Sequence, residues 1–355
     1  MMISEYDILV VGAGPAGSSA AWAAAAAGAR VLVVERRKAV GVPVRCAEFI
    51  PRLLLGELPF RDRGFVVQAV RAMRAVLPDG TVKETRAPGL TIHRDQFDQL
   101  LADYARQAGV EILEQVRAVG TEDGFVVLKQ AGGSLSRVRA KVIIGADGPH
   151  STVGRWMGLR VRRLIPALQV RVSLSKPMEH TEVYFHPWIY GAYGWVFPKD
   201  DQANVGLAIA QGSKWSRPPK ATLEWFVGRL RHEGKIKGPT YNSTFGWIPV
   251  EPLQTAVKGN MMLVGDAAGH THPITGAGVP QAVACGKAAG ICAAEAAAKN
   301  DPGLLKRYDQ QWQEDVGEAL HLAVERRKIL ERQWHLLNDI LPYCWIGFKE
   351  YYERT

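Results

Sequence analysis

Three glycines near the start of the chain have the spacing needed to bind a dinucleotide. Gly12, Gly14 and Gly17 follow a short apolar run and open an Ala-rich stretch. In such a strand–turn–helix unit, the first glycine permits the tight turn, the second lets the backbone approach a pyrophosphate, and the third lets helix and strand pack closely. A second apolar run ends in Glu35, whose carboxylate can accept hydrogen bonds from a ribose. Because both strands and the acid accompany the glycines, the pattern favours a dinucleotide site over a glycine-rich turn in an unrelated α/β domain.

Two more acidic residues follow apolar runs. Asp147 stands in a Gly-Ala-Asp-Gly turn, and Asp266 follows the run 261–264 and one glycine. A carboxylate in this position can accept hydrogen bonds from a polyol such as ribityl. The glycines after Asp266 would let backbone N–H groups face a flat ring. Asp266 could instead cap a helix, since aspartate is a favoured N-cap residue.

The three segments, in this order, resemble the flavoprotein monooxygenase superfamily, which has the p-hydroxybenzoate hydroxylase type of fold and FAD as cofactor. A narrower resemblance, to the geranylgeranyl reductase family, covers about residues 5–300. The segment 193–198, Tyr-Gly-Trp-Val-Phe-Pro, looks like that family's Tyr-x-Trp-x-Phe-Pro signature. The segment 43–48, Pro-Val-Arg-Cys-Ala-Glu, resembles its Pro-x-x-Cys-Gly-Glu segment. On its own, the aromatic segment would be better explained by core packing.

Three residues depart from the family's pattern. Ala47 stands where glycine is usual, and His272 stands where asparagine is more common before Pro-Ile-Thr-Gly. Ala208 stands where a second glycine would be expected. The last two lie in or near the expected flavin and substrate cavity, so the substrate could differ from the family's usual one.

The resemblance also implies which residues bind the cofactor. Glu35 would hold the adenosine ribose and Asp266 the ribityl chain. Arg94 would reach the flavin or its phosphates, although an arginine on a helix surface is the alternative. The residues expected to contact FAD are Gly12, Gly14, Ala16, Gly17, Glu35, Arg36, Arg45, Cys46, Ala47, Arg94, Val116, Asp147, Gly148, Gly265, Asp266, Pro273, Gly276, Gly278 and Val279.

The resemblance implies an α/β fold, with a Rossmann-like FAD-binding domain, an inserted antiparallel-sheet substrate domain and a short helical C-terminus. Alternating apolar and polar residues with turns between them support strands in the inserted part. The C-terminal tail is amphipathic and aromatic, so it can dock on the flavin domain, cap a lipid pocket or touch a membrane interface. The expected boundaries are 1–62, 93–160 and 257–300 for the FAD-binding domain, 63–92 and 161–256 for the sheet domain, and 301–355 for the C-terminal helices.

The amino-acid composition narrows the classes of protein and of binding partner that remain. The four cysteines form no Cys-x-x-Cys pair and no metal-ligand spacing, which suits a reducing cytoplasm. We expect neither a spanning helix nor a signal peptide, because no apolar run reaches about 18 residues and the N-terminus leads directly into the first strand. The net charge of +9 could attract NADPH, an anionic lipid headgroup, an acidic protein or a membrane surface, or be ordinary surface charge. Nucleic acid is not an expected partner, since no basic helix accompanies the charge.

The expected function is that of an FAD-dependent oxidoreductase reducing C=C bonds of a prenyl lipid or quinone side chain, with NAD(P)H as a candidate donor. The flavin would carry the chemistry and the protein would orient it. By resemblance, Cys46 lies beside the ring as the candidate proton donor; a buried structural cysteine is the alternative. Tyr193 and Trp195 would form an apolar wall around a hydrophobic substrate. Two other functions stay open: a carrier passing electrons to a redox partner, such as an iron–sulfur or radical enzyme of a cofactor-assembly pathway like that of lipoate, and a flavin hydroxylase.

Overall fold

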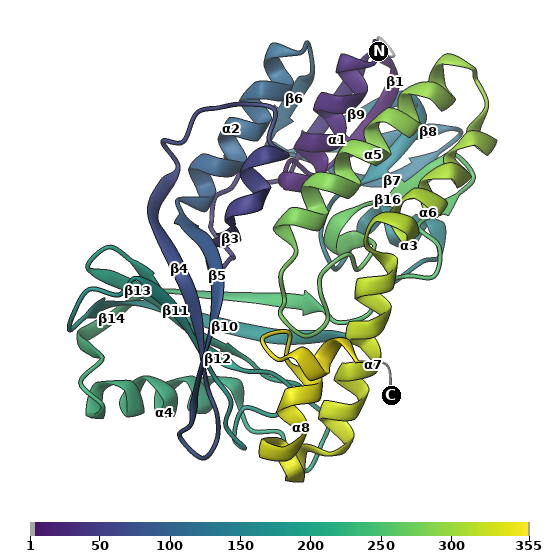
Figure 1. The fold of residues 1–355 in the computed structure, drawn as a ribbon. Coiled ribbons are helices and arrows are strands. Elements are labelled where there is room, and N and C mark those ends of the chain that lie inside the picture. The colour runs from purple at the N-terminus through teal and green to yellow at the C-terminus, as the bar shows by residue number, and fades with distance from the viewer. Residues whose placement is uncertain (1–3, 354–355) are drawn as a thin grey trace.

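The computed structural model describes residues 4–353, whose strands form two sheets with helices packed against each (Figure 1). The first sheet has a parallel centre in the order β16-β9-β1-β2-β6. Strands β1 and β2 are apolar along most of their length and buried, as expected of parallel strands covered on both faces. The central strands are β1 (Ser4–Val11), β2 (Val31–Glu35), β6 (Glu111–Glu114), β9 (Leu135–Gly145) and β16 (Met261–Leu263). Antiparallel pairing adds β7 (Val116–Glu122), β8 (Phe125–Gln130) and β15 (Val257–Lys258).

Two helices rich in small residues pack closely beside this sheet. They are α1 (Pro15–Ala26) and α5 (Val279–Ala298). A Cβ atom on Gly286 would lie 2.5 Å from the carbonyl oxygen of Ala16, and one on Gly290 would lie 2.1 Å from that of Ala20. Only glycine therefore permits this approach of the two helix backbones, which explains the small residues of α5. The neighbouring helices are α2 (Arg94–Gln107) and α3 (Thr152–Met157).

The second sheet has the order β14-β10-β13-β12-β11-β4-β5-β3 and lies below the first in Figure 1. Its pairs are antiparallel except for β11 with β4, which run parallel. The helix α4 (Pro219–His232) covers one face and buries Phe226 and Leu230 there. The strands are β3 (Phe49–Pro51), β4 (Val66–Val76), β5 (Val82–Ile92), β10 (Leu164–Leu174), β11 (His180–Tyr184), β12 (Gly194–Lys199), β13 (Gln202–Ala208) and β14 (Ile236–Pro249).

The fold class expected from the sequence is confirmed, with both the Rossmann-like part and the inserted sheet present. Strand β3 falls within the range 1–62 expected for the FAD-binding domain, yet it pairs with β5 in the second sheet. The chain therefore crosses between the sheets just after Cys46. The exact division of the chain into domains stays a prediction.

The C-terminal part is helical and contacts both parts of the protein, with Tyr308 and Trp312 in the core of the first part and Leu337 and Trp345 in that of the second. It contains α6 (Lys306–Trp312), α7 (Glu318–Arg332) and α8 (Leu337–Cys344). Trp345 is only 2% exposed, and its ring packs against those of Phe185 and Tyr193 at centroid distances of 5.0 and 5.1 Å. The aromatic tail thus covers the part of the second sheet that carries Tyr193. Within residues 4–353, no helix combines the length and the apolar character needed to cross a membrane.

Candidate active site

The three glycines at the start of α1 have three different surroundings. Gly12 has φ +101°, and a Cβ atom there would lie 2.5 Å from the carbonyl oxygen of Ala146. A Cβ on Gly17 would lie 1.9 Å from the carbonyl oxygen of Gly12, whereas one on Gly14 would meet no atom within 4 Å. Gly12 and Gly17 are therefore required by the protein's own packing. Gly14 instead keeps open the space in front of the helix N-terminus, where free N–H groups can bind a phosphate.

Glu35 ends β2 directly beside this turn. Its carboxylate accepts hydrogen bonds from the backbone N–H groups of Ala13, at 3.0 Å, and Arg37, at 2.9 Å. The side chain is largely buried. Because each carboxylate oxygen has more than one lone pair, both can still accept from a ribose hydroxyl. Glu35 thus fixes the glycine turn and remains a suitable partner for a ribose.

Asp266 lies at the end of β16 and is not a helix cap. Its Oδ1 accepts a hydrogen bond from the hydroxyl of Thr271 at 2.6 Å, and burial raises its pKa. The helix α5 begins after Gly278, without any side-chain cap. A Cβ atom on Gly278 would lie 3.4 Å from Asp266 Oδ1, so the loop 265–278 closes tightly around this carboxylate. These contacts leave the second oxygen of Asp266 available to a ligand.

Asp147 has a role within the protein. It accepts hydrogen bonds from the Ser151 hydroxyl at 2.5 Å and from the Thr152 N–H at 2.6 Å. These contacts tie the turn after β9 to the start of α3. Burial raises the pKa of Asp147 in spite of them.

Arg94 joins segments that are far apart in the sequence. Its Nε donates to Asp98 Oδ1 at 2.7 Å, its guanidinium also interacts with Cys46, and its positive charge acts on Asp266. Burial opposes the charge of Arg94, but Asp98 and Cys46 raise its pKa above the usual value. The side chain is 16% exposed, so Arg94 is not an arginine on a helix surface.

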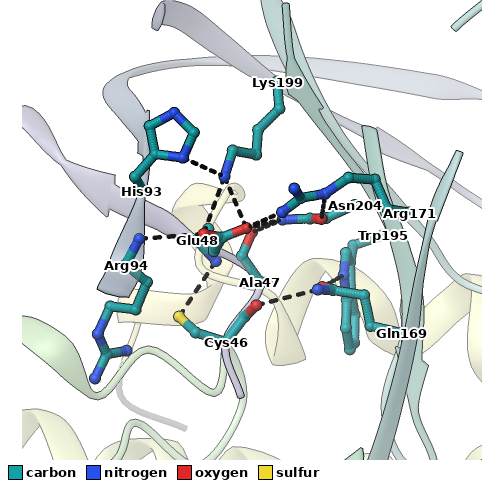
Figure 2. A network of polar contacts seen from close by, with 10 residues as sticks. All are labelled: Cys46, Ala47, Glu48, His93, Arg94, Gln169, Arg171, Trp195, Lys199 and Asn204. Atoms are coloured by element: carbon teal, nitrogen blue, oxygen red, sulfur yellow. Dashed lines mark hydrogen bonds and ion pairs between the residues drawn. The ribbon is translucent and has the colours of Figure 1, made fainter. Parts of the chain in front are cut away.

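A buried carboxylate that sequence analysis missed holds the segment around Cys46 (Figure 2). Glu48 is 1% exposed. Both its oxygens lie 3.0 Å from Lys199 Nζ, and they also accept from Arg171 at 2.6 Å and Asn204 at 2.9 Å. Burial alone would raise the pKa of Glu48, but Asn204 and Lys199 lower it, so the carboxylate is ionised. With φ +64°, its backbone adopts a conformation that non-glycine residues rarely adopt, and these contacts hold it there.

Two amide side chains from the second sheet bind the backbone of the same segment. Gln169 donates to the carbonyl oxygen of Cys46 at 3.1 Å, and Asn204 donates to that of Ala47 at 3.1 Å. Trp195 in turn donates from its indole Nε1 to Gln169 Oε1 at 2.9 Å (Figure 2). Trp195 is thereby connected to Cys46 through a single amide.

A small apolar cavity lies between the segment of Tyr193 and Trp195 and the loop 273–276. Tyr193 closes one side by donating its hydroxyl to the carbonyl oxygen of Thr275. Ala208, one of the departures from the family's pattern, lines this cavity together with Ile165 and Ile248. A larger residue at 208 would therefore reduce the space available to a substrate.

His272, the other departure, holds the loop in shape. Its Nδ1 accepts hydrogen bonds from the N–H groups of Ile274, at 3.3 Å, and Thr275, at 3.2 Å. Burial lowers its pKa to about 4, so the ring is neutral near pH 7 and its proton is on Nε2, which lies 3.5 Å from the hydroxyl of Tyr351. The C-terminal tail is thus in contact with the loop that borders the cavity.

The remaining residues that are expected to contact FAD lie in different parts of the structure. Ala16 and Gly265 meet at the start of α1, where a Cβ on Gly265 would lie 2.9 Å from that of Ala16. Val116 lies in β7 with its side chain in the core of the first part. Arg36 and Arg45 are exposed and make no hydrogen bond or ion pair within residues 4–353, and their contact with FAD stays a prediction. The last four expected residues lie in or beside the loops described above: Gly148, Pro273, Gly276 and Val279.

These groups fit FAD. The open space in front of Gly14 suits a pyrophosphate, and Glu35 can bind a ribose at the end of β2. Asp266 can bind a polyol at the end of β16, and Arg94 interacts electrostatically with both Asp266 and Cys46. The ends of parallel strands are where such folds bind dinucleotides.

Comparisons with known proteins agree with this geometry. Residues 7–149 match the family described as FAD dependent oxidoreductase. The chain is 34% identical to a digeranylgeranylglycerophospholipid reductase of Methanococcus vannielii, over 94% of this chain and 88% of that protein. It is 38% identical to digeranylgeranylglycerophospholipid reductase 1 of Methanopyrus kandleri, over 92% and 91%.

Solved structures show the same fold. A geranylgeranyl bacteriochlorophyll reductase-like protein from Thermoplasma acidophilum has a TM-score of 0.82 and 30% identity, covering 95% of this chain and 92% of that one. A triple mutant of the flavin-dependent brominase Bmp2, at a TM-score of 0.73 and 18% identity over 97% of this chain and 96% of that one, is similar in fold alone. The fold and site define an FAD-dependent oxidoreductase. Within that class, the chain belongs to the geranylgeranyl reductase family.

Proposed function

We propose that this protein reduces C=C bonds in the prenyl chains of a glycerophospholipid, the class of compound named for its relatives from Methanococcus vannielii and Methanopyrus kandleri. The observation that carries the proposal is the apolar cavity beside Tyr193 and Trp195, which is linked through Gln169 to the backbone of Cys46. An unbranched polar substrate would bind poorly between these walls. The cavity is small, about 20 Å³, so a prenyl chain must push its walls apart to enter.

Reduction of an alkene adds a hydride to one carbon and a proton to the other, and reduced FAD supplies the hydride when bound. The proposed proton donor is Cys46. Its Sγ accepts a hydrogen bond from the Glu48 N–H at 3.2 Å, and the guanidinium of Arg94 lies beside it. Water then returns a proton to the thiolate.

Tyr193 is a poorer proton donor than Cys46. Its hydroxyl proton is already shared with the carbonyl oxygen of Thr275, and burial raises its pKa. The proposed role of Tyr193 is therefore to close the cavity and exclude water. Trp195 has a positioning role, because its indole N–H is used to hold Gln169 against Cys46.

Two further parts of the proposal concern partners. NAD(P)H is the proposed electron donor, because the net charge of +9 attracts a phosphorylated nucleotide. Contact with an anionic membrane surface is proposed from the same charge and from exposed aromatic side chains on the edge strand β14: Tyr241, Phe245 and Trp247. Reduction of FAD by NADPH and co-sedimentation with anionic vesicles test these two parts.

The experiment for the proposed function is anaerobic turnover. The purified protein, with FAD reduced by dithionite, is incubated with digeranylgeranylglycerophospholipid, and the product is analysed by mass spectrometry. We expect the lipid to gain two hydrogen atoms for each reduced bond. A lipid of unchanged mass, with the flavin still reduced, would leave no support for alkene reduction and would direct attention to a protein as electron acceptor.

A further inference from the structure

A basic cleft lies between α7 and the start of β10. Its volume is about 380 Å³, and it is lined by Arg163, Tyr190, Lys328, Glu331 and Arg332. Three of these five residues are cationic and one is acidic. The residues that line the cleft come from α7 and from the segments before β10 and β12, and an ion pair joins Glu331 of α7 to Arg163.

The single carboxylate that lines the cleft already forms ion pairs with two arginines. Glu331 Oε1 lies 2.8 Å from Arg327 Nε, and its Oε2 lies 2.6 Å from Arg163 Nη2. Within residues 4–353, Lys328 forms an ion pair only with Glu325, and this pair lies at the surface. No residue in the same range forms an ion pair with Arg332. The cleft therefore has an excess of positive charge, with free N–H donors on Lys328 and Arg332.

The buried side chain of Arg327 contacts residues of both this cleft and the apolar cavity. Besides its contact with Glu331, its guanidinium donates to the carbonyl oxygens of Pro273 and Gly191, each at 2.8 Å. Pro273 lines the cavity, and Gly191 stands between a residue of the cleft, Tyr190, and a residue of the cavity, Ala192. One guanidinium thus contacts the linings of both spaces.

The start of β10 shows the same adjacency. Arg163 lines the cleft and Ile165 lines the cavity. Residues two apart along an extended chain point to the same face. An amphiphile can therefore place its charged group against Arg163 and its apolar chain against Ile165.

We propose that the basic cleft binds the phosphate of the lipid whose prenyl chain enters the apolar cavity, an inference that rests on the proposed function. Arginine and lysine are the side chains that bind phosphate oxygens most strongly, through charge-assisted hydrogen bonds. This arrangement selects phosphorylated lipids over neutral prenyl alcohols of the same length.

The test measures the binding of two lipids to the oxidised holoprotein, with flavin fluorescence as the signal of binding. One lipid is digeranylgeranylglycerol phosphate and the other is the neutral digeranylgeranylglycerol. The variant K328A/R332A removes the two cationic side chains of the cleft that form no ion pair with a buried residue. The matched control is R71A/R74A, which removes two charges at exposed pairs on β4.

We expect the Kd of the phosphorylated lipid to rise about tenfold or more in K328A/R332A, since each charge-assisted contact is worth about this much. The Kd of the neutral lipid should not change, and the control should bind both lipids as the wild type does. An unchanged Kd for the phosphorylated lipid in K328A/R332A overturns the inference.

A free phosphate ion is the other source of the same chemistry. Calorimetric titration with inorganic phosphate separates the two: if K328A/R332A loses phosphate binding but keeps the wild-type Kd for the phosphorylated lipid, the cleft is an ion site and the headgroup assignment is overturned. Turnover is judged separately, because lipid binding is measured without reduction. A wild-type protein that binds the phosphorylated lipid through this cleft but does not reduce it supports the headgroup site and refutes the proposed function.

Discussion

The backbone N–H of Glu48 donates to the sulfur of Cys46 at 3.2 Å, while the carboxylate of Glu48 is itself buried and held by side chains of the second sheet. The position of the thiol therefore depends on a carboxylate two residues away. That carboxylate is ionised and fixed by Lys199 and Arg171. The second sheet thus sets the geometry of a segment that also contacts the flavin-binding part through Arg94.

The first prediction concerns Glu48. Glu48→Gln leaves Lys199 and Arg171 without their buried counter-charge, so the free energy of unfolding should fall by about 3–5 kcal/mol. The control Glu84→Gln breaks an exposed ion pair with Arg74 and should cost no more than about 1 kcal/mol. Urea unfolding of both variants measures the difference. Equal losses would mean that the Glu48 network contributes no special stability.

The same network predicts a dependence on pH. Because the pKa of Glu48 is lowered in the folded protein, its contribution to stability is complete above the unfolded value of 4.5 and is lost as the pH falls through the folded pKa. Wild type should therefore lose more stability than Glu48→Gln below about pH 4.5. Thermal melts of both proteins between pH 7 and pH 3 measure this difference in stability. Parallel pH profiles for the two proteins would show that Glu48 does not titrate as described.

The second prediction separates ligand binding from folding at Asp266. Burial raises the pKa of this carboxyl, so its ionisation opposes folding and stability is lost as the pH rises through that pKa. Asp266→Asn should therefore leave the FAD-free protein at least as stable as wild type at pH 7. It should at the same time weaken FAD binding. Flavin titration and a melt of the FAD-free protein measure both; a destabilised variant with normal FAD affinity would indicate a purely structural role.

The third prediction uses two glycines of the same turn. A Cβ on Gly14 meets open space, so Gly14→Ala should leave the melting temperature of the FAD-free protein unchanged while weakening FAD binding at least about tenfold. A Cβ on Gly17 meets the carbonyl oxygen of Gly12, so Gly17→Ala should lose about 1–3 kcal/mol of stability. Tight FAD binding by Gly14→Ala would place the pyrophosphate elsewhere.

The fourth prediction tests the cavity. Ala208→Leu should fill the space beside Tyr193 and Trp195 and lower kcat/KM for a prenyl lipid about tenfold or more, while reduction of FAD by dithionite stays normal. Ala208→Gly is the matched variant and should preserve turnover. If Ala208→Leu reduces the lipid as fast as wild type, the chain does not pass through this cavity.

The sequence predicts the parts of the site that are local in the chain. The glycine turn lies beside Glu35, and Asp266 follows the end of β16, because each of these arrangements is encoded within a few residues; their contacts with FAD stay predictions. The Glu48 network is different, because its partners come from separate strands of the second sheet. One signal was available: Gln169 and Arg171 are polar residues two apart in strand β10, whose only other polar residue is Ser173.

The C-terminal tail could not be placed from its sequence. Its amphipathic pattern allowed docking on the flavin domain, over a pocket or at a membrane. The contact of Trp345 with Tyr193, and that of Tyr351 with His272, depend on how α7 and α8 lie across the second sheet. Such long-range packing leaves no trace in local residue spacing.

The proposed role of Cys46 as proton donor in alkene reduction is tested most directly by a stopped-flow measurement of flavin reoxidation by the prenyl phospholipid. For Cys46→Ala we predict full FAD content, normal reduction by dithionite and reoxidation about 10²–10⁴-fold slower than in wild type, the usual contribution of a general acid. Cys292→Ala, which removes a half-buried thiol on α5, should reoxidise at the wild-type rate. Reoxidation of Cys46→Ala by the lipid at the wild-type rate would contradict the account.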